Sequence, residues 1–293
     1  TRPGALDTKA VPLKLDSDIN ELLKRSTVAQ IYESVIADID EAEKLINKES
    51  WEENFKYRFT TLSVLSMRSR VLLYMGQWKE AYDAAEVVLA QKNTLEDFNA
   101  ESYKLPNHYQ SVENITALER GMNSNYNQAG VASEVLLSSY AEGDLRRDAY
   151  FKEPDKNGYR FSQKGGKDEF RCSFRVGEMY LNAAEAAAQS DKLPQARTRL
   201  LELMQKRYTP EVYVTKATEV NAMNKEALIQ EILNERTREL AFEGHRWFDL
   251  RRTTRPRIEK VLKGETYILE QDDARYTLQI PRDAVAANPE LAN

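Results

Sequence analysis

The chain has 293 residues, enough for a sizeable buried core, and a net charge of −5 with acidic and basic residues interspersed. That balance argues against the basic electrostatic footprint by which a protein binds nucleic acid or a membrane surface. One cysteine and two histidines exclude a disulfide framework and a zinc site built from three or four such ligands.

The first long helix is predicted to begin near Thr27. Residues 1–25 contain two prolines and a glycine and are predicted to be extended and irregular. Thr27 and Gln30 have the spacing of a capping box, in which each side chain bonds a free amide of the first helical turn. Apolar residues then recur every three or four positions, which predicts a helix to about Ile46.

Two helical hairpins are predicted from repeated apolar spacing. In the first, at about 60–91, a helix over Thr60–Met75 stops at Gly76, and a second helix follows from Trp78. The stretch YMGQWKEAYDAAEVVL resembles a tetratricopeptide repeat. The second hairpin is predicted at about 175–207, with helices over Val176–Gln189 and Pro194–Arg207. Two such units do not make a solenoid, so other helices must cover their faces.

Residues 94–172 differ in character and predict a small excursion of loops and strands. Tyrosine, asparagine and glutamine are frequent there, and the apolar runs are short. Tyr159–Ser162 and Phe170–Phe174 flank the turn-prone sequence KGGKD and are predicted to pair as a hairpin.

The stretch Ala227–Arg252 predicts a long central helix that is apolar on more than one side. Gly244 costs about 1 kcal/mol in a helix interior, which predicts a kink or close packing at Glu243–His245. Arg236 and Glu243 fall within the apolar stripe and are expected to pair with other buried polar groups.

Glu235, Glu239 and Glu243 recur every fourth residue, a spacing that could suggest metal ligands. A dimetal bundle would need a Glu-x-x-His motif on the same face, which is missing, so no metal site is predicted. The spacing favours ion pairs between residues three apart instead: Glu235 with Arg238, Glu243 with Arg246, and Asp249 with Arg252. His245 lacks a neighbouring nucleophile and orienting group, so no catalytic residue is predicted either.

Ligand binding is predicted for two groups of side chains in the 94–172 region. Amides can bond paired hydroxyls, and tyrosine offers a flat face for stacking on a sugar or peptide, although asparagine and glycine are also common in turns. The first group is Asn123, Asn125, Tyr126, Asn127 and Gln128, and the second is Tyr103, His108 and Tyr109.

The sequence NERTRELAFEGHRWFDLRR resembles the signature near the C-terminus of the SusD/RagB family. VPLKLDSD, EGDLRRDAYF, VGEMYLNAAEA and IPRDAVAANPEL resemble further segments of that family, in the same order. The resemblance implies an all-α, SusD-like fold with tetratricopeptide-type helix hairpins, and a single domain over residues 1–293. It also implies that the chain is the C-terminal majority of a longer protein, whose lipidated cysteine and N-terminal helices lie upstream.

The resemblance further implies a non-catalytic protein at the surface of the outer membrane, held there by an N-terminal lipid anchor. Such a protein captures an oligosaccharide and delivers it to a SusC-like TonB-dependent transporter, and no cofactor is implied. Two alternatives stay open: a peptide-binding member of the same family, and a tetratricopeptide-type scaffold for protein partners. A glycoside hydrolase would need two carboxylates flanking a cleft, and no such pair stands out among the 47 acidic residues.

Overall fold

The computed structural model describes residues 4–18, 21–120, 131–164, 170–171 and 173–292. The chain divides into two compact units. The larger unit is Ala42–Arg246, and the smaller one combines Thr1–Glu41 with Trp247–Asn293. The chain is mostly helical with a few short strands, so the predicted all-α class with a small β and loop excursion is confirmed.

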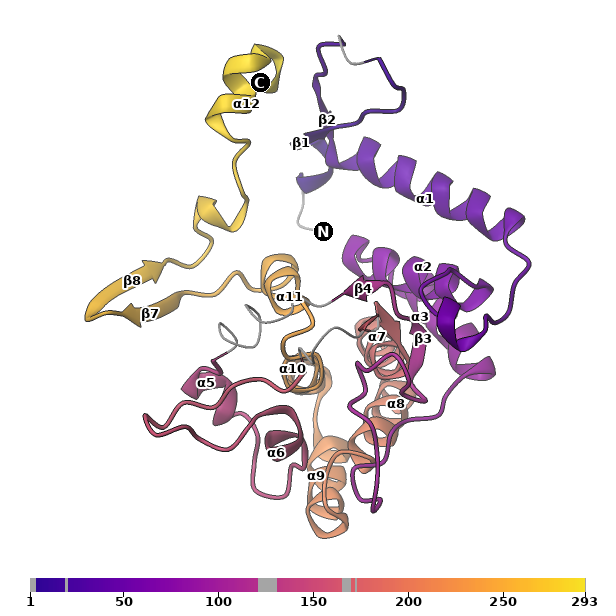
Figure 1. Ribbon diagram of the computed structural model, residues 1–293, viewed down its shortest axis with the longest axis vertical. Helices are drawn as coiled ribbons and strands as arrows, with labels where there is room; N and C mark the ends of the chain where they lie inside the picture. Colours follow the sequence, from indigo (N-terminus) through magenta and orange to yellow (C-terminus); the bar gives the residue numbers. More distant parts are fainter. Residues whose placement is uncertain (1–3, 19–20, 121–130, 165–169, 172, 293) are drawn as a thin grey trace. The chain divides into compact units, whose positions relative to one another are not determined.

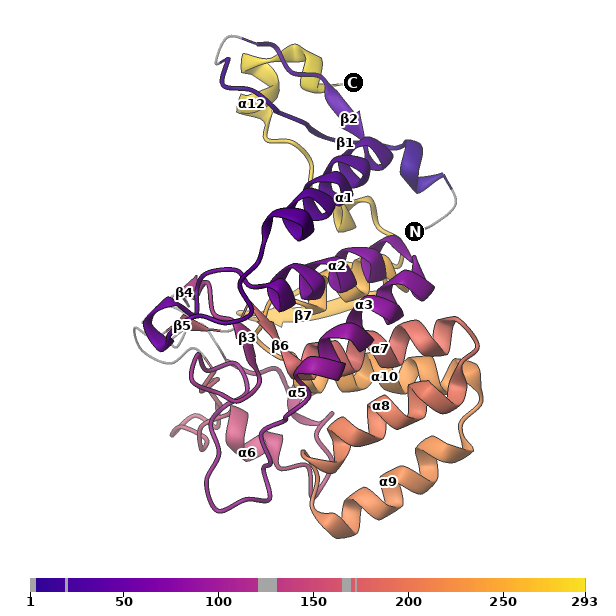
Figure 2. The ribbon, with the colours of Figure 1, turned by 90° about the vertical axis from the view of Figure 1, so that its right-hand side faces the viewer.

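Six helices pack side by side in the larger unit, in the order that Figure 2 shows. Helix α3 packs on α2 and α7, while α8 packs on α7 and α9, and α10 packs on α7. The bounds of these helices are α2 (Thr61–Met75), α3 (Trp78–Gln91), α7 (Val176–Gln189), α8 (Leu193–Gln205), α9 (Pro210–Ala222) and α10 (Lys225–Glu239). The two predicted hairpins are therefore α2–α3 and α7–α8, and α9 is an additional helix.

Local sequence signals set the ends of the α2–α3 hairpin. The Thr60 side chain accepts a hydrogen bond from the Ser63 amide, and the Ser63 hydroxyl accepts one from the Thr60 amide. Gly76 ends α2 in the left-handed conformation, with φ of 79°, which glycine adopts without steric cost. The sequence therefore fixes where the chain reverses.

Helix α7 lies at the centre of the larger unit. Its residues from Val176 to Ala188 are all buried. Alanine and glycine supply six of its 14 residues, so neighbouring helices can approach it closely. The larger of two hydrophobic clusters runs from Ala85 of α3 through Met179 of α7 to Ile232 of α10.

The helix predicted over Ala227–Arg252 is interrupted rather than kinked. Helix α10 ends at Glu239, and α11 (Arg246–Arg252) begins after a turn. In that turn Phe242 and Gly244 both have positive φ, 61° and 81°, which no α-helix accommodates. The prediction of one continuous helix over Ala227–Arg252 was wrong. Gly244 alone does not show that Phe242, two residues earlier, also adopts the left-handed conformation.

The loop and strand excursion of residues 94–172 pairs differently from the prediction. Strand β3 (Asn114–Thr116) pairs with β6 (Phe174–Arg175), and β4 (Glu119–Arg120) pairs with β5 (Phe170–Arg171). Short helices α5 (Glu134–Leu137) and α6 (Arg146–Tyr150) lie in the same region.

The predicted hairpin between Tyr159–Ser162 and Phe170–Phe174 was therefore wrong. Phe161 and Ser162 bridge to Val131 and Phe151 instead. Both segments have partners distant in the chain, which local turn signals do not reveal.

The described residues of the smaller unit contain two antiparallel strand pairs and three α-helices. Strand β1 (Lys9–Pro12) pairs with β2 (Arg25–Thr27), and β7 (Ile258–Leu262) pairs with β8 (Glu265–Leu269). The helices are α1 (Val28–Leu45), most of α11, and α12 (Arg282–Ala287). The predicted capping box is confirmed, since Thr27 and Gln30 exchange hydrogen bonds of 2.9 and 3.2 Å. Figure 1 labels all of these elements.

Candidate functional site

Two parts of the larger unit bear on function: the loop that presents the predicted aromatic cluster, and a buried ionic network beneath it. The residues predicted to bind ligand through amides and one tyrosine lie outside the described residues: Asn123, Asn125, Tyr126, Asn127 and Gln128. Tyr103, His108 and Tyr109 are all described.

Tyr103 lies flat against a buried phenylalanine. Its ring stacks on Phe98, with centroids 4.4 Å apart and planes 15° from parallel, and 39% of the residue is exposed. Burial of the phenol, with a smaller contribution from Asp148, raises its pKa, so Tyr103 stays neutral at physiological pH. A supported, partly exposed ring of this kind can stack on an apolar sugar face.

His108 and Tyr109 lie against each other, whereas Tyr103 has a separate ring partner. The centroids of His108 and Tyr109 are 4.7 Å apart, and both residues are half-buried. His108 Nδ1 accepts a hydrogen bond from the Gln110 amide at 3.1 Å. Asn114 donates to the Tyr109 carbonyl at 2.9 Å. The first bond orients the His108 ring, and the second holds the backbone of Tyr109.

Glu96 organises the loop from which these three side chains project. Its carboxylate accepts the Lys104 amide at 3.2 Å and the Val112 amide at 3.0 Å, so one side chain ties two points of the loop together. The Glu96 amide donates to Glu113 Oε1 at 3.1 Å. Both carboxylates are buried, and Glu113 connects the loop to the network below.

Arg207 and Arg175 hold the Glu113 carboxylate from two directions. Arg207 Nη2 lies 2.5 Å from Glu113 Oε1, and Arg175 Nη1 lies 3.0 Å from Oε2. Arg207 also donates to the Glu96 carbonyl at 2.5 Å. The base of the loop is therefore fixed by charge-assisted hydrogen bonds, which are stronger than neutral ones.

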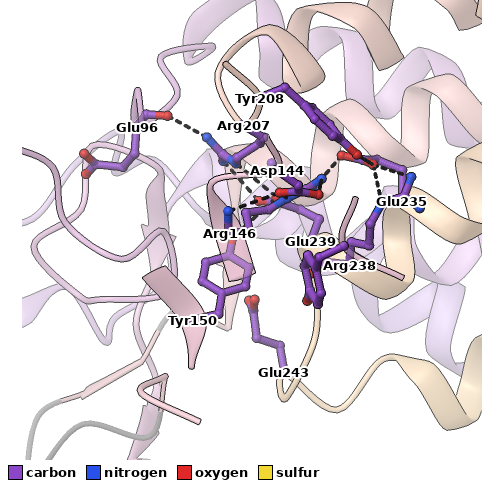
Figure 3. A network of polar contacts seen from close by, with 12 residues as sticks. Glu96, Asp144, Arg146, Tyr150, Arg207, Tyr208, Glu235, Arg238, Glu239 and Glu243 are labelled. Carbon is purple, nitrogen blue, oxygen red and sulfur yellow. Dashed lines mark hydrogen bonds and ion pairs between the residues drawn. The ribbon is translucent and has the colours of Figure 1, made fainter. Parts of the chain in front are cut away.

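Glu239 is the central acceptor of the network (Figure 3). Arg175, Arg207 and Arg146 approach its carboxylate at 2.8, 3.0 and 3.1 Å, and the Tyr150 hydroxyl lies at 3.4 Å. Burial alone would raise the pKa of Glu239, but the three guanidinium groups outweigh it and hold the pKa well below its usual range. Glu239 is therefore ionised.

Arg146 extends the network from Glu239 to Glu235, one turn earlier in α10. It lies 2.7 Å from Asp144 and 2.5 Å from Glu235. Glu235 in turn pairs with Arg238 at 2.7 Å, which confirms the pair predicted from their spacing.

Glu243 extends the network in the other direction. Glu243 pairs with Arg175 at 2.8 Å and with Lys164 at 2.5 Å. Its predicted pair with Arg246 stays a prediction. Burial lowers the pKa of Lys164 to about 8 despite the Glu243 charge. Burial would raise the pKa of Glu243, but Arg175 and Lys164 lower it to about 2. Asn107 donates to the Lys164 carbonyl at 2.9 Å, a second tie to the loop.

The network is balanced in charge, which explains how so many ionised groups can be buried together. Five buried cations meet five buried anions: Arg146, Lys164, Arg175, Arg207 and Arg238 with Glu113, Asp144, Glu235, Glu239 and Glu243. Arg238 also pairs with the partly exposed Glu231 at 2.5 Å. Every carboxylate is ion-paired, so none of them resembles a general base or a metal ligand awaiting its ion. Across the described ranges, no group of three acidic, histidine or cysteine side chains could hold a metal.

Most of the network escaped prediction from sequence. Arg236 and Glu243 were correctly expected to find buried polar partners, and Arg236 donates to Asn182 at 2.8 Å. Arg175 and Arg207 were not singled out, although Arg175 stands between Phe174 and Val176 in an apolar stretch. A charge at such a position is the signal that could have found it.

Two family models match the chain. The model described as "SusD family" matches residues 149–293, and the one described as "Starch-binding associating with outer membrane" matches residues 7–73. No curated protein matches the sequence.

Three solved structures illustrate the similarity. A SusD superfamily protein from Bacteroides fragilis is 25% identical over 98% of this chain and 70% of its own, with a TM-score of 0.79. A SusD superfamily protein from Bacteroides thetaiotaomicron is 23% identical over 97% and 70%, with a TM-score of 0.76. A SusD-like carbohydrate binding protein from Bacteroides vulgatus is 20% identical over 97% and 70%, with a TM-score of 0.71.

The helical fold and the two family models agree on one class, the SusD-like helical proteins. The chain belongs to the SusD/RagB family. It spans about 70% of the length of the solved relatives named above. Within the part of the chain that the structure describes, no helix is long and apolar enough to cross a membrane.

Proposed function

We propose that this protein captures an oligosaccharide at the surface of the outer membrane and delivers it to a TonB-dependent transporter. The observation that supports this most is membership of a family with a model described as starch-binding and associating with the outer membrane. A solved relative described as a carbohydrate binding protein adds to it. An N-terminal lipid anchor would hold the protein at the membrane.

The loop that presents Tyr103, His108 and Tyr109 has a geometry suited to non-catalytic ligand binding. Tyr103 offers a ring backed by Phe98, and His108 and Tyr109 form a second aromatic surface on the same loop. Glu96 and Glu113 hold the loop in shape before any ligand arrives, which reduces the ordering cost of binding. The predicted amides of residues 123–128 would add hydrogen bonds to hydroxyl groups.

Calorimetry with a panel of soluble glycans and short peptides tests this proposal. We expect heat with at least one glycan, and a loss of about two- to tenfold in affinity for Tyr103→Ala, Tyr109→Ala or Tyr126→Ala, the usual worth of one stacked ring. Tyr159→Ala is the matched control, because Tyr159 is 54% exposed but outside both predicted groups.

Each alternative outcome has a definite meaning. Glycan binding that survives all three substitutions would keep the function and reject the proposed residues. Binding of peptides alone would favour the alternative that the protein is a peptide-binding member of the family. Release of shorter sugars from the glycan that binds would contradict a purely non-catalytic role.

A further inference from the structure

A group of aromatic rings surrounds one arginine in the segment that precedes α2. The guanidinium carbon of Arg58 lies 4.4 Å from the ring centroid of Phe55, 5.0 Å from that of Trp51 and 5.8 Å from that of Tyr57. Phe55 and Tyr57 meet edge to face at 6.2 Å. We name Trp51, Phe55, Tyr57 and Arg58 the Arg58 cluster.

The cluster is held in place by bonds to the rest of the unit. Trp51 Nε1 donates to the Phe59 carbonyl at 2.8 Å, and the Thr61 amide donates to the Lys48 carbonyl at 2.9 Å. The Ala117 amide donates to the Lys56 carbonyl at 2.9 Å. The rings are half-buried and fixed, while Arg58 is exposed.

The Arg58 cluster borders the loop of the candidate site. Lys56 Nζ lies 3.5 Å from the Tyr109 carbonyl oxygen, and Gln110 donates to the Glu53 carboxylate at 2.5 Å. A ligand lying over His108 and Tyr109 is therefore close to the segment that contains Arg58.

Arg58 differs from most arginines of its unit in having rings rather than an acid as its partners. Nine others lie within ion-pair distance of a carboxylate: Arg68, Arg70, Arg146, Arg160, Arg175, Arg199, Arg207, Arg236 and Arg238. Within the described part of the chain, Arg58 makes no such pair, and the nearby Glu53 bonds Gln110 instead.

Rings against a guanidinium face occupy its π surface but leave its N–H groups, which lie in the plane of the group. Those groups donate best to a planar anion, since a carboxylate accepts two parallel hydrogen bonds from them. The rings restrict the side chain in advance, so less rotamer freedom is lost when an anion binds. Lys48, whose Nζ lies 5.6 Å from the Trp51 ring centroid, adds a second positive charge.

We propose that Arg58 binds the carboxylate of an acidic sugar, so that the glycan captured by this protein contains uronic acid residues. The proposal rests on the proposed function and narrows it to a substrate class. The sugar carboxylate would bond the N–H edge of Arg58, and its neighbouring ring would reach the aromatic loop beside it.

A matched pair of ligands isolates the carboxylate. The whole chain is titrated by calorimetry with tetragalacturonate and with the same tetramer fully methyl-esterified, which keeps the rings but removes the charges. We expect the acid form to bind at least about tenfold more tightly, the worth of one charge-assisted pair. We also expect that preference to weaken as salt is raised, because an exposed ion pair is screened.

Substitution of Arg58 then locates the effect. Arg58→Gln should remove the preference for the acid form and leave binding of the ester unchanged, and Arg58→Lys should restore only part of it. Arg147→Gln is the control, because Arg147 is also exposed and lies on α6, outside the Arg58 cluster. We expect both variants to fold, because both side chains are exposed, and circular dichroism checks this.

Equal binding of acid and ester, or an acid preference that persists in Arg58→Gln, would overturn the inference. If only neutral glycans bind, the proposed function stands and the uronate assignment fails. If no glycan in the panel binds, both fail together.

Discussion

Glu239 shows how one carboxylate can organise several distant parts of a chain. It accepts hydrogen bonds from Arg146, Arg175 and Arg207, which come from three different segments. All four side chains are buried, so solvent cannot replace a missing partner. The consequence of removing a single charge is therefore large.

Glu239→Gln should lower the free energy of unfolding by about 3–5 kcal/mol, because it leaves buried guanidinium groups without their common counter-charge. Urea unfolding followed by circular dichroism measures this. The control is Glu202→Gln. Glu202 and Arg199 form a partly exposed ion pair, so this substitution should lower the free energy of unfolding by less than about 1 kcal/mol. Equal effects of the two substitutions would show that the network contributes no more than a surface pair.

Glu243 predicts how the stability depends on pH. Its folded pKa of about 2 lies below the ordinary 4.5, so its ionised form stabilises the fold above pH 4.5. The advantage of the native chain over Glu243→Gln should be about 3 kcal/mol near pH 6, since one pKa unit is worth about 1.4 kcal/mol. It should fall to less than half of that by about pH 3. Urea titrations of both proteins at several pH values between about 3 and 6 measure this difference. A difference that does not change with pH would contradict the lowered pKa of Glu243.

At the residue scale, the sequence predicted the pairs that depend on helical spacing. Glu235 with Arg238 and Asp249 with Arg252 are three residues apart within one helix, and both pairs are present at 2.7 Å. Glu243 lies beyond the end of α10, so helical spacing no longer governs it. Its partners are chosen by tertiary packing, which the local sequence does not encode.

Gly177 shows why the start of α7 needs a residue without a side chain. A Cβ atom there would lie 2.9 Å from Glu113 Oε2 and 3.1 Å from Glu239 Oε1, and closer still to Arg175 Nη1. The Gly177 amide itself donates to Glu113 at 3.1 Å. The helix backbone thus approaches the ionic network directly.

Gly177→Ala should destabilise the protein by about 1–3 kcal/mol, because the added methyl group displaces charged partners. This outcome opposes the helix propensity, which favours alanine over glycine by about 1 kcal/mol in a helix interior. Thermal unfolding of the two proteins distinguishes the effects. A rise in melting temperature would mean that the network yields to the methyl group.

At the element scale, periodicity and end signals predicted α1, α2, α3, α7 and α8. All five have a regular apolar spacing, and some add an end signal: a capping box at the start of α1 and of α2, Gly76 at the end of α2, and Pro194 in the first turn of α8. The β7–β8 hairpin was not predicted, although Lys263 and Gly264 form its left-handed turn. Its strands are mostly exposed, so no alternation of buried and exposed residues marked them.

The two units differ in how much of them is buried. In the described part of the smaller unit only Ile39, Asp249 and Tyr276 are buried, whereas α7 alone buries nearly all of its residues. Local opening costs least where few apolar contacts must be broken.

Hydrogen exchange should therefore be uneven across the molecule. We expect amides of β7 and β8 to exchange at least about 100-fold faster than those of α7, because opening them exposes little buried surface. Mass spectrometry of peptides from native exchange measures both in one experiment. Comparable protection of the hairpin and α7 would mean that contacts beyond the hairpin stabilise it.

At the scale of the whole molecule, a long motif was more informative than composition. NERTRELAFEGHRWFDLRR and the segments that accompany it led to the correct family, while composition alone indicated only a helical protein. The organisation of residues 1–293 as one domain stays a prediction, as do the eight ligand-binding residues. Loop residues such as Tyr103 owe their orientation to contacts distant in the chain, so their roles could not follow from spacing.

The ionic network should also affect the rate of unfolding, and not only the equilibrium stability. Its pairs join residues far apart in sequence: 93 positions for Arg146 with Glu239, and 94 for Arg207 with Glu113. Helical hairpins close locally and early, so we expect these pairs to be absent from the folding transition state. Breaking them would then accelerate unfolding and leave refolding almost unchanged. In stopped-flow experiments, Glu239→Gln should shorten the lifetime of the native chain by the same factor by which it weakens the fold.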